Sequence, residues 1–238
     1  MVRNESRRFW RSALACWSLF ADDILVLDDG STDATAQIAE SAGAIVIRRS
    51  GPEAWGNESP VRQQLFDLAI ANTGPGDWIL FLDADMCPAR NPKDLAFNGT
   101  SDAWLFPLYD LWSADPMRYR WDEYWYGHIH PRLWMIKRPE PQDWAWPPLG
   151  IHSGHLPVNF HVMQPGFAPQ DYGLLHFPYS TPELREQKFR QYMSVRHQLS
   201  PQQLAHAKTI IDGQPKTYPL PFRPEYRLYL EPELKEAA

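Results

Sequence analysis

The stretch Leu25–Ala44, LVLDDGSTDATAQIAESAGA, ends an apolar run in two adjacent aspartates, a glycine and further short polar residues. A second stretch, Asp77–Pro88 (DWILFLDADMCP), leads an apolar run into an Asp-Ala-Asp triplet. Both patterns are typical of buried strands that carry acids at their carboxyl ends, where open α/β sheets bind ligands. The two stretches therefore predict one ligand site lined by strand-end carboxylates. These are Asp28, Asp29, Asp83 and Asp85.

Helical and strand patterns alternate through the first third of the chain. The helices are expected at about 5–20 and 34–42 and from Ser59–Pro60 onward, and the strands at 24–27, 44–47 and 78–82. This αβαβαβ order predicts an α/β fold with a Rossmann-like, mostly parallel sheet flanked by helices. Asp33 fits a cap of the second helix, which explains it without any chemistry.

The composition of the sequence changes after about Pro88, where proline and tryptophan become frequent. Strands are expected at Trp104–Leu108 and Arg132–Lys137, joined by ordered loops. A further helix opens at STPELREQKFRQYMSVRHQL, Ser180–Leu199, where Ser180 and Thr181 both fit a cap. A peripheral helix and an extended arm are expected after it.

Length and charge limit the class of protein. A chain of 238 residues can bury one sizeable core, so one domain is the simplest arrangement. The formal net charge of −6 and the lack of a Lys/Arg run argue against a nucleic-acid surface. No segment approaches the roughly 18 apolar residues of a membrane span.

The compartment is expected to be the cytoplasm. Cys16 and Cys87 form neither a CxxC pair nor a zinc pattern, and we expect two reduced thiols. The apolar stretch Ala13–Ala21 follows several arginines and mimics a short signal peptide, but its helical spacing favours a helix of the domain. Peripheral contact with a membrane stays open.

Taken in order, these motifs resemble family 2 glycosyltransferases of the GT-A fold, which are nucleotide-diphospho-sugar transferases. The likeness is specific up to Pro88 and looser beyond it. The matching segments are Val2–Ser6, Ala21–Val46, Ser59–Ile70 and Gly76–Pro88, then Pro131–Lys137 and Leu174–Tyr192. The resemblance implies one GT-A domain over 1–238. It would comprise a nucleotide-sugar half at 1–88, an acceptor half at 89–199 and a C-terminal extension at 200–238.

The resemblance also implies residues that bind the donor. Asn4 and Glu5 match the loop after the family's first strand, near the nucleotide. Asp29, with Asp28 beside it, matches the acid that reads the base, usually uracil. On the donor side, Arg62 matches a basic helix residue, and Asp83 would face the ribose or the metal shell.

A divalent cation is implied as well. Asp85 matches the metal-binding member of the family's DxD motif, and His176 resembles a late histidine that helps hold the metal or the diphosphate. Oxygen ligands suit Mg²⁺ or Mn²⁺, which would offset the charge of the departing diphosphate. The implied reaction transfers a sugar, by a single inverting displacement, from a UDP-sugar to a saccharide, lipid or other acceptor, as in polysaccharide biosynthesis.

Two departures from the family pattern stand out. Members carry a strand before the Asn-Glu pair, whereas here only Met1–Val2 precede Arg3, so that strand is expected to be lacking or reduced to a stub. Relatives also carry acids on the acceptor side, where this chain has GIHSGHLP at Gly150–Pro157. His152 is the expected general base, because an imidazole titrates near neutral pH, and Asp122 is the alternative. Other acids considered for this role are Glu123, Asp143 and Asp171.

Two further questions stay open in the sequence. Five tryptophans of the second half fit either stacking on a sugar or packing of loops: Trp112, Trp121, Trp125, Trp144 and Trp146. The basic residues of the last clear helix, Arg185, Lys188 and Arg190, could meet a phosphate, but a solvated face is the favoured expectation. The second function considered is a non-catalytic nucleotide-sugar or carbohydrate-binding relative that lost the first strand and the base.

Overall fold

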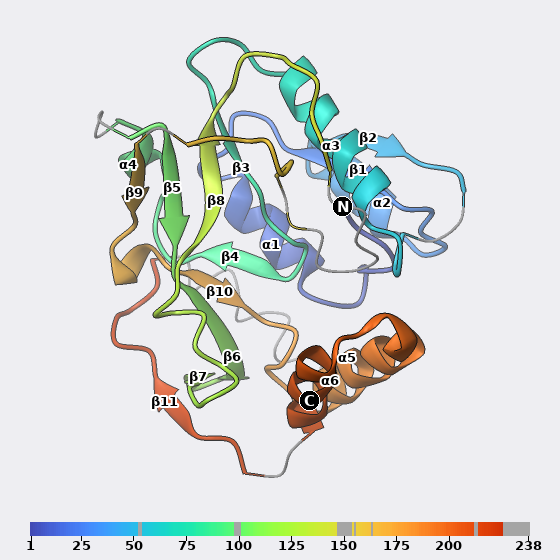
Figure 1. Cartoon of the computed structure of the whole chain (residues 1–238), viewed down its shortest axis with the longest axis vertical. Coiled ribbons are helices and arrows are strands. Elements are labelled where there is room, and N and C mark those ends of the chain that lie inside the picture. Colours follow the sequence, from blue (N-terminus) through green and yellow to red (C-terminus); the bar gives the residue numbers. More distant parts are fainter. Residues whose placement is uncertain are drawn as a thin grey trace.

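The computed structural model describes residues 1–51, 54–97, 101–146, 154, 156–162, 164–211 and 214–225. In this part of the chain, three sheets and six α-helices are arranged as Figure 1 shows. The β1–β2 pair with α1, α2 and α3 forms one region, and a four-stranded sheet lies beside it. A five-stranded sheet and helices α5 and α6 complete the fold.

The first region confirms the alternation expected from the sequence. Its elements are α1 (Trp10–Trp17), β1 (Leu25–Asp28), α2 (Thr35–Ser41), β2 (Ile45–Arg48) and α3 (Ser59–Ala71). Strands β1 and β2 are parallel and in register along their whole length. Val2 extends this sheet by one residue pair, because its N–H donates to the Leu27 carbonyl and its carbonyl accepts from the Asp29 N–H. The segment before the Asn-Glu pair therefore lies along β1.

The other two sheets contain both parallel and antiparallel pairs. The five-stranded sheet has the order β11 (Thr217–Pro219), β7 (Met117–Arg120), β6 (Leu108–Ala114), β10 (Leu174–His176) and β4 (Met86–Pro88). The four-stranded sheet has the order β3 (Trp78–Leu80), β8 (Arg132–Lys137), β5 (Ala103–Phe106) and β9 (Pro165–Phe167). Within these two sheets the parallel pairs are β6–β10 and β5–β9.

The expected α/β class is observed, but the sheets are mixed rather than mostly parallel. The cause is the second half of the chain, which supplies return strands. Strand β3 pairs antiparallel with β8, and β6 with β7. Local periodicity located β8 at its observed bounds but carries no information about which strand it joins.

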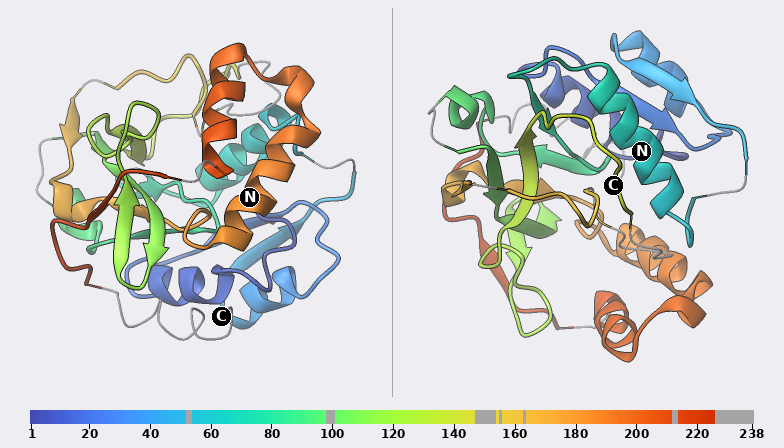
Figure 2. Two further views of the ribbon diagram at one scale, coloured as in Figure 1. Left: turned by 90° about the horizontal axis from the view of Figure 1, so that it is seen from below. Right: turned by 45° about the horizontal axis from the view of Figure 1, so that its top comes forward.

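The remaining helices cover the second half. They are α4 (Lys93–Phe97), α5 (Pro182–Ser194) and α6 (Pro201–Lys208), with short 3₁₀ turns at Gln170–Tyr172, Arg196–Gln198 and Thr209–Ile211. Of the two candidate caps of α5, Thr181 is the one used, and its hydroxyl accepts from the Leu184 N–H at 3.3 Å. Helices α5 and α6 lie side by side (Figure 2). No helix in the described ranges has both the length and the apolar character needed to cross a bilayer.

Helix α1 packs against β4 through a fully buried face. The Trp17 indole donates to the Met86 carbonyl at 3.1 Å, whereas the fully buried Trp10 indole donates to the Thr35 carbonyl of α2 at 3.0 Å. On the same contact Cys16 forms a disulfide with Cys87, 71 residues away, with a Cα–Cα distance of 6.6 Å. The expectation of two reduced thiols is therefore wrong. The sequence did not show that α1 places one cysteine directly over the other.

The disulfide gives a first prediction. Protein unfolded in guanidinium without reductant should show no thiol that reacts with Ellman's reagent, and two after reduction. Reduction should also lower the free energy of unfolding by about 4 kcal/mol, because the closed loop restricts the unfolded chain. Two reactive thiols before reduction would contradict the bond.

Candidate functional site

The Asp-Ala-Asp segment lies in a tight turn between β3 and β4. The Asp83 carbonyl accepts from the Met86 N–H at 3.0 Å, which closes the turn. The Asp85 carbonyl accepts from the Phe177 N–H at 2.9 Å, directly after β10. The backbone thus fixes both carboxylates before any ligand arrives, and it sets Asp85 beside the end of β10.

A histidine between two carboxylates forms the centre of the site. His176 ends β10, and its Nδ1 lies 2.7 Å from Oδ1 of Asp110, its register partner in β6. Its Nε2 lies 3.5 Å from Oδ1 of Asp85. The side chains are only 12%, 13% and 17% exposed for His176, Asp110 and Asp85. The structure therefore joins Asp85 and His176, as expected, and adds Asp110, which the sequence analysis missed.

The carboxylates favour a charged imidazole at this position. Burial lowers the pKa of His176, but Asp85 and Asp110 outweigh burial and raise this pKa to about 9. Burial likewise raises the pKa of Asp85, while His176 and then Lys188 lower it, so that the net shift is downward. A divalent cation bound by this imidazole would have to displace its proton.

Lys188 of α5 also faces these acids. Burial lowers its pKa, but Asp85, followed by Tyr192, Asp83 and Glu5, raises it above the usual value. Lys188 and Asp85 line one small depression, together with Arg8, Phe9, Pro178, Leu184, Gln187 and Gln191. The expectation that Lys188 lies on a solvated face is wrong, since helical spacing alone does not show which neighbour a face meets.

The other two basic residues of α5 do not reach the acids. Arg185 donates to the carbonyls of Trp112 and Tyr179, at 3.1 and 2.7 Å. Arg190 pairs with Glu186 on the surface, as expected for a solvated face. Among the basic residues of α5, Lys188 is thus the one that faces the acid cluster.

Glu5 joins the cluster from the loop before α1. Its side chain is 15% exposed and accepts from Arg8 at 3.1 Å. Burial, with Asp85 adding to it, raises the pKa of Glu5 to about 7, although Arg8 and Lys188 act in the opposite direction. Glu5 is therefore close to half-protonated at neutral pH.

Asn4 and Asp33 position this loop. The Asn4 Oδ1 accepts from the Thr32 N–H at 2.9 Å, and the residue has a positive φ of 54°. Asp33 accepts from the N–H groups of Thr35 and Ser6, at 3.0 and 3.2 Å. The N-cap of α2 is Ala34, without a side-chain cap, so Asp33 bonds the first N–H group of the helix from one residue outside the cap. Asn4 ties its own loop to the loop that follows β1.

Arg62 of α3 lies between two acids at the edge of the cluster. Its Nη1 is 3.4 Å from Oδ1 of Asp83, and its Nε is 3.6 Å from Oε2 of Glu58. The Arg62 side chain is 13% exposed, while that of Asp83 is 33% exposed. Arg62 and Asp83 therefore meet, a contact that the sequence did not predict, and the Asp83 side chain is partly exposed.

The two acids after β1 are deeply buried. The Asp28 carboxylate accepts from the Ser31 N–H at 3.3 Å and so closes the turn that contains Gly30. Asp29 forms an ion pair with Arg49, and its other oxygen accepts from the Ala54 N–H at 2.7 Å. Asp29 is 3% exposed, so the chain after β2 covers it.

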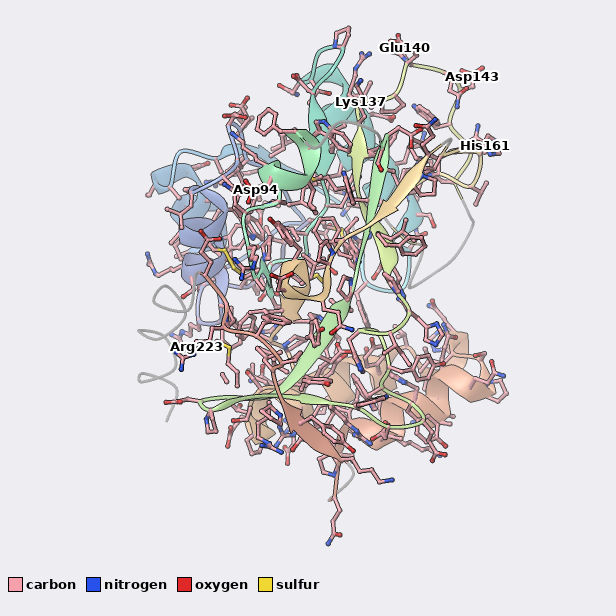
Figure 3. All side chains as sticks on the ribbon, turned by 90° about the vertical axis from the view of Figure 1, so that its left-hand side faces the viewer. Asp94, Lys137, Glu140, Asp143, His161 and Arg223 are labelled. Atoms are coloured by element: carbon pink, nitrogen blue, oxygen red, sulfur yellow. A yellow bond between two sulfur atoms is a disulfide. The ribbon has the colours of Figure 1, made fainter. Side chains whose placement is uncertain are left out.

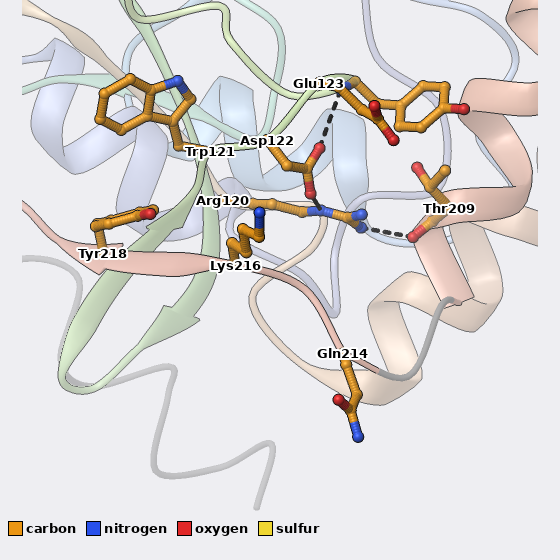
Figure 4. A pocket seen from close by; sticks show the side chains of 9 residues that line it. Arg120, Trp121, Asp122, Glu123, Thr209, Gln214, Lys216 and Tyr218 are labelled. Carbon is orange, nitrogen blue, oxygen red and sulfur yellow. Dashed lines mark hydrogen bonds and ion pairs between the residues drawn. The ribbon is translucent and has the colours of Figure 1, made fainter.

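The alternative general base, Asp122, is not part of this cluster. His152 lies outside the described residues. Asp122 accepts from Arg120 Nε at 2.6 Å and from the Tyr124 N–H at 3.0 Å, in a separate pocket that also includes Glu123 (Figure 4). Asp171 pairs with Arg90 at 2.7 Å. Asp143, labelled in Figure 3, lies on an outer loop at one end of the molecule.

The donor set of the cluster fits a cation that is shared with a substrate. The described part of the chain holds no group of three or more His, Cys, Asp or Glu side chains arranged as a metal cage. Asp85 and His176 instead offer one carboxylate and one imidazole, 3.5 Å apart. Mg²⁺ in particular is often bound by one or two carboxylates and completed by substrate phosphates and water.

Comparison with known proteins agrees with the motifs. The family model "Glycosyl transferase family 2" matches residues 4–157, more than half of the chain. Uncharacterized proteins of Mycobacterium tuberculosis and Mycobacterium bovis are each 27% identical to it over 164 residues. The match covers 60% of this chain and 36% of each relative, so the chain spans about a third of the length of these curated relatives.

The buried pair at Asp29 gives a second prediction. Arg49→Met should lower the free energy of unfolding by roughly 2–4 kcal/mol in urea titrations, because it removes the closer charge partner of the buried Asp29 carboxylate and leaves only Arg3, 3.9 Å away. Arg48→Met is the matched control, since the adjacent Arg48 pairs with Glu40 on the surface and exposed pairs contribute about 0–1 kcal/mol. Equal losses of unfolding free energy in the two variants would show that the buried Asp29 pair stabilises the fold no more than a surface pair does.

Glu5 gives a third prediction, on pH. Its pKa of about 7 in the folded protein exceeds the ordinary glutamate pKa of 4.5, so folding favours the protonated form. The contribution of Glu5 to the free energy of unfolding is complete below pH 4.5 and is lost as pH rises through 7. Between pH 5 and 8 the wild type should therefore lose about 1–3 kcal/mol more stability than Glu5→Gln. The surface variant Glu40→Gln should follow the wild type, and parallel curves for all three would contradict the shift.

Proposed function

The chain belongs to glycosyl transferase family 2, and on this basis we propose that it transfers a sugar from a nucleotide-diphospho-sugar, a UDP-sugar in the first instance, to a saccharide, lipid or other acceptor. The observation that carries the proposal is the meeting of Asp83, Asp85, His176 and Lys188 at one point. Acids next to a lysine and an imidazole suit a diphosphate that arrives with a cation. A binding protein with the same donor site is the alternative.

The donor would lie across the ends of β1 and β3. We assign Asp29, with Asp28 beside it, to the base and Asp83 to the ribose or the metal shell. Arg62 and Lys188 would compensate phosphate charge, because both already face acids at this edge. Asp29 keeps its bond to the Ala54 N–H, so its remaining capacity as an acceptor is shared between Arg49 and the base.

We assign the cation site to Asp85 and His176, with Mn²⁺ or Mg²⁺ as the ion. When bound, such an ion withdraws charge from the diphosphate as it leaves. Asp85 is held ready by its backbone bond to Phe177, and Asp110 orients the imidazole through Nδ1. Asn4 and Glu5 would shape the wall of the site next to the nucleotide.

Inversion requires a group that takes the proton of the acceptor hydroxyl. We propose His152 as this base; Asp122, the alternative expected from the sequence, is paired with Arg120 in a separate pocket and is not retained. Glu5 is a second candidate. Its pKa of about 7 suits proton transfer at neutral pH, and its charge interacts with that of Asp85. Loss of turnover with unchanged UDP binding would identify the base.

The fourth prediction tests the cation site. Titration calorimetry of the wild type should show UDP binding that Mn²⁺ strengthens, and Asp85→Ala should abolish this enhancement. Loss of an outer-sphere partner of a metal ligand costs about 10- to 100-fold in metal affinity, so loss of the ligand itself should cost at least as much. Asp23→Ala is the matched control, because Asp23 is an exposed aspartate just before the opposite end of β1.

The possible outcomes separate the two functions. Release of UDP from a nucleotide-sugar panel, dependent on Mn²⁺ and on Asp85, supports the transferase. Metal-enhanced UDP binding without turnover on any donor or acceptor supports the binding protein. Unchanged, metal-enhanced binding by Asp85→Ala removes Asp85 from the site, and a wild type that binds no nucleotide overturns both proposals.

We propose that 1–238 act as one domain, with the halves at 1–88 and 89–199 and the extension at 200–238. A role in polysaccharide biosynthesis remains part of the proposal, but the cytoplasmic location expected from the sequence does not. Disulfides are rare in the reducing cytoplasm, so the Cys16–Cys87 bond argues against that location. Thiol titration of protein taken from its native compartment tests the assignment.

A further inference from the structure

A pocket of about 420 Å³ opens at the end of the β6–β7 hairpin, away from the acid cluster (Figure 4). Its lining combines aromatic rings with charged side chains. The residues that matter for the argument are Arg120, Trp121, Asp122, Tyr124, Lys216 and Tyr218. None of them lines the depression at Asp85 and Lys188.

The aromatic residues of this pocket are exposed. Trp121, Tyr124 and Tyr218 are 41%, 40% and 41% exposed. The Trp121 ring is nevertheless held in place, with its centroid 5.0 Å from the His128 ring and 5.4 Å from the Tyr218 ring. A large ring that is braced by its neighbours and still open to solvent provides a rigid apolar platform.

The other tryptophans that the sequence left open are engaged elsewhere. Trp112 and Trp125 are 7% and 2% exposed and pack against each other. Trp144 and Trp146 pack edge-on against the fully buried Phe66. Of the five, Trp121 is the one that lines this pocket.

The polar side of the pocket is rigid as well. The Arg120 side chain is 4% exposed, donates to Asp122 at 2.6 Å and donates to the Thr209 carbonyl at 2.6 Å. Its guanidinium lies 4.7 Å from the centre of the Trp112 ring. Asp122 is thereby fixed as an acceptor beside the aromatic rings, while Lys216 offers donors from β11's side of the pocket.

We propose that this pocket binds a saccharide, as the part of the acceptor chain that lies away from the reaction. A sugar ring presents an apolar face of C–H groups and an edge of hydroxyls. Trp121 and Tyr218 suit the face, and Asp122 and Lys216 suit the hydroxyls. The role as an acceptor subsite rests on the proposed function, but the binding of a saccharide does not.

The sheet order gives the lateral offset between this subsite and the proposed reaction centre. Strands β10, β6, β7 and β11 are consecutive neighbours in one sheet, with His176 on the first and Tyr218 on the last. Three strand spacings correspond to roughly 14 Å. The ligand is therefore an oligosaccharide of several units, because a single sugar cannot occupy the pocket and reach the donor.

The fifth prediction is a direct binding test on a glycan microarray. Labelled wild-type protein should bind oligosaccharides on the array, and calorimetry with the best soluble hit should give its affinity. Trp121→Ala and Tyr218→Ala should each weaken that affinity at least tenfold. Tyr126→Ala is the matched control, because Tyr126 is 44% exposed and lies against His130, outside the residues that line the pocket. It should bind like the wild type.

The result is independent of the donor site. Asp85→Ala should keep the glycan affinity while it loses metal-enhanced UDP binding. Absence of binding to any glycan on the array overturns the inference, as does an affinity that neither pocket variant changes. In either case UDP binding by the wild type would still support the proposed function. Loss of glycan binding in Tyr126→Ala to the same degree would likewise overturn the assignment to this pocket.

Discussion

The contact of His176 with Asp85 and Asp110 is the interaction on which the site depends. Two mostly buried carboxylates so close together would be costly unless a positive charge lay between them. The imidazolium supplies that charge, and it also links the turn before β4 to β10 and β6. Under the proposed function, a divalent cation at Asp85 would meet the same electrostatic need.

Several local features of the site could be predicted from the sequence. The strands that end near Asp28–Asp29 and near Asp83–Asp85 could be predicted from a few neighbouring residues, because strand burial and turn formation depend on local sequence. The strand at Arg132–Lys137 was located at its observed bounds for the same reason. The bond from the Thr35 N–H to Asp33 also follows from the place of Asp33 just before α2.

Features that depend on long-range contacts could not be predicted. Asp110 became part of the site because β6 lies in register with β10, and Lys188 because α5 packs over the acids. Arg49 follows β2 and turns back onto Asp29. The Cys16–Cys87 bond and the mixed sheets have the same origin. The hydrophobic pattern of a proline- and tryptophan-rich segment does not indicate which strands are neighbours in a sheet.

The second half of the chain supports the donor site and adds a surface of its own. Its aromatic core runs from Trp125 to Tyr179, with ring centres 4.7 Å apart, and from Tyr179 to His176, 5.5 Å apart. Arg120 packs against this core from the other side, 5.4 Å from the Trp125 ring. One layer of packed rings therefore separates the polar side of the aromatic pocket from the imidazole of the cation site. Both sites are built on the same five-stranded sheet.

The most direct measurement is diffraction from crystals grown with UDP and Mn²⁺, with data collected at the manganese absorption edge. The account predicts one strong anomalous peak about 2.1 Å from an Asp85 carboxylate oxygen, with His176 beside it and the diphosphate completing the coordination. An ordered diphosphate with manganese bound elsewhere, and with His176 still held between Asp85 and Asp110, would contradict the account.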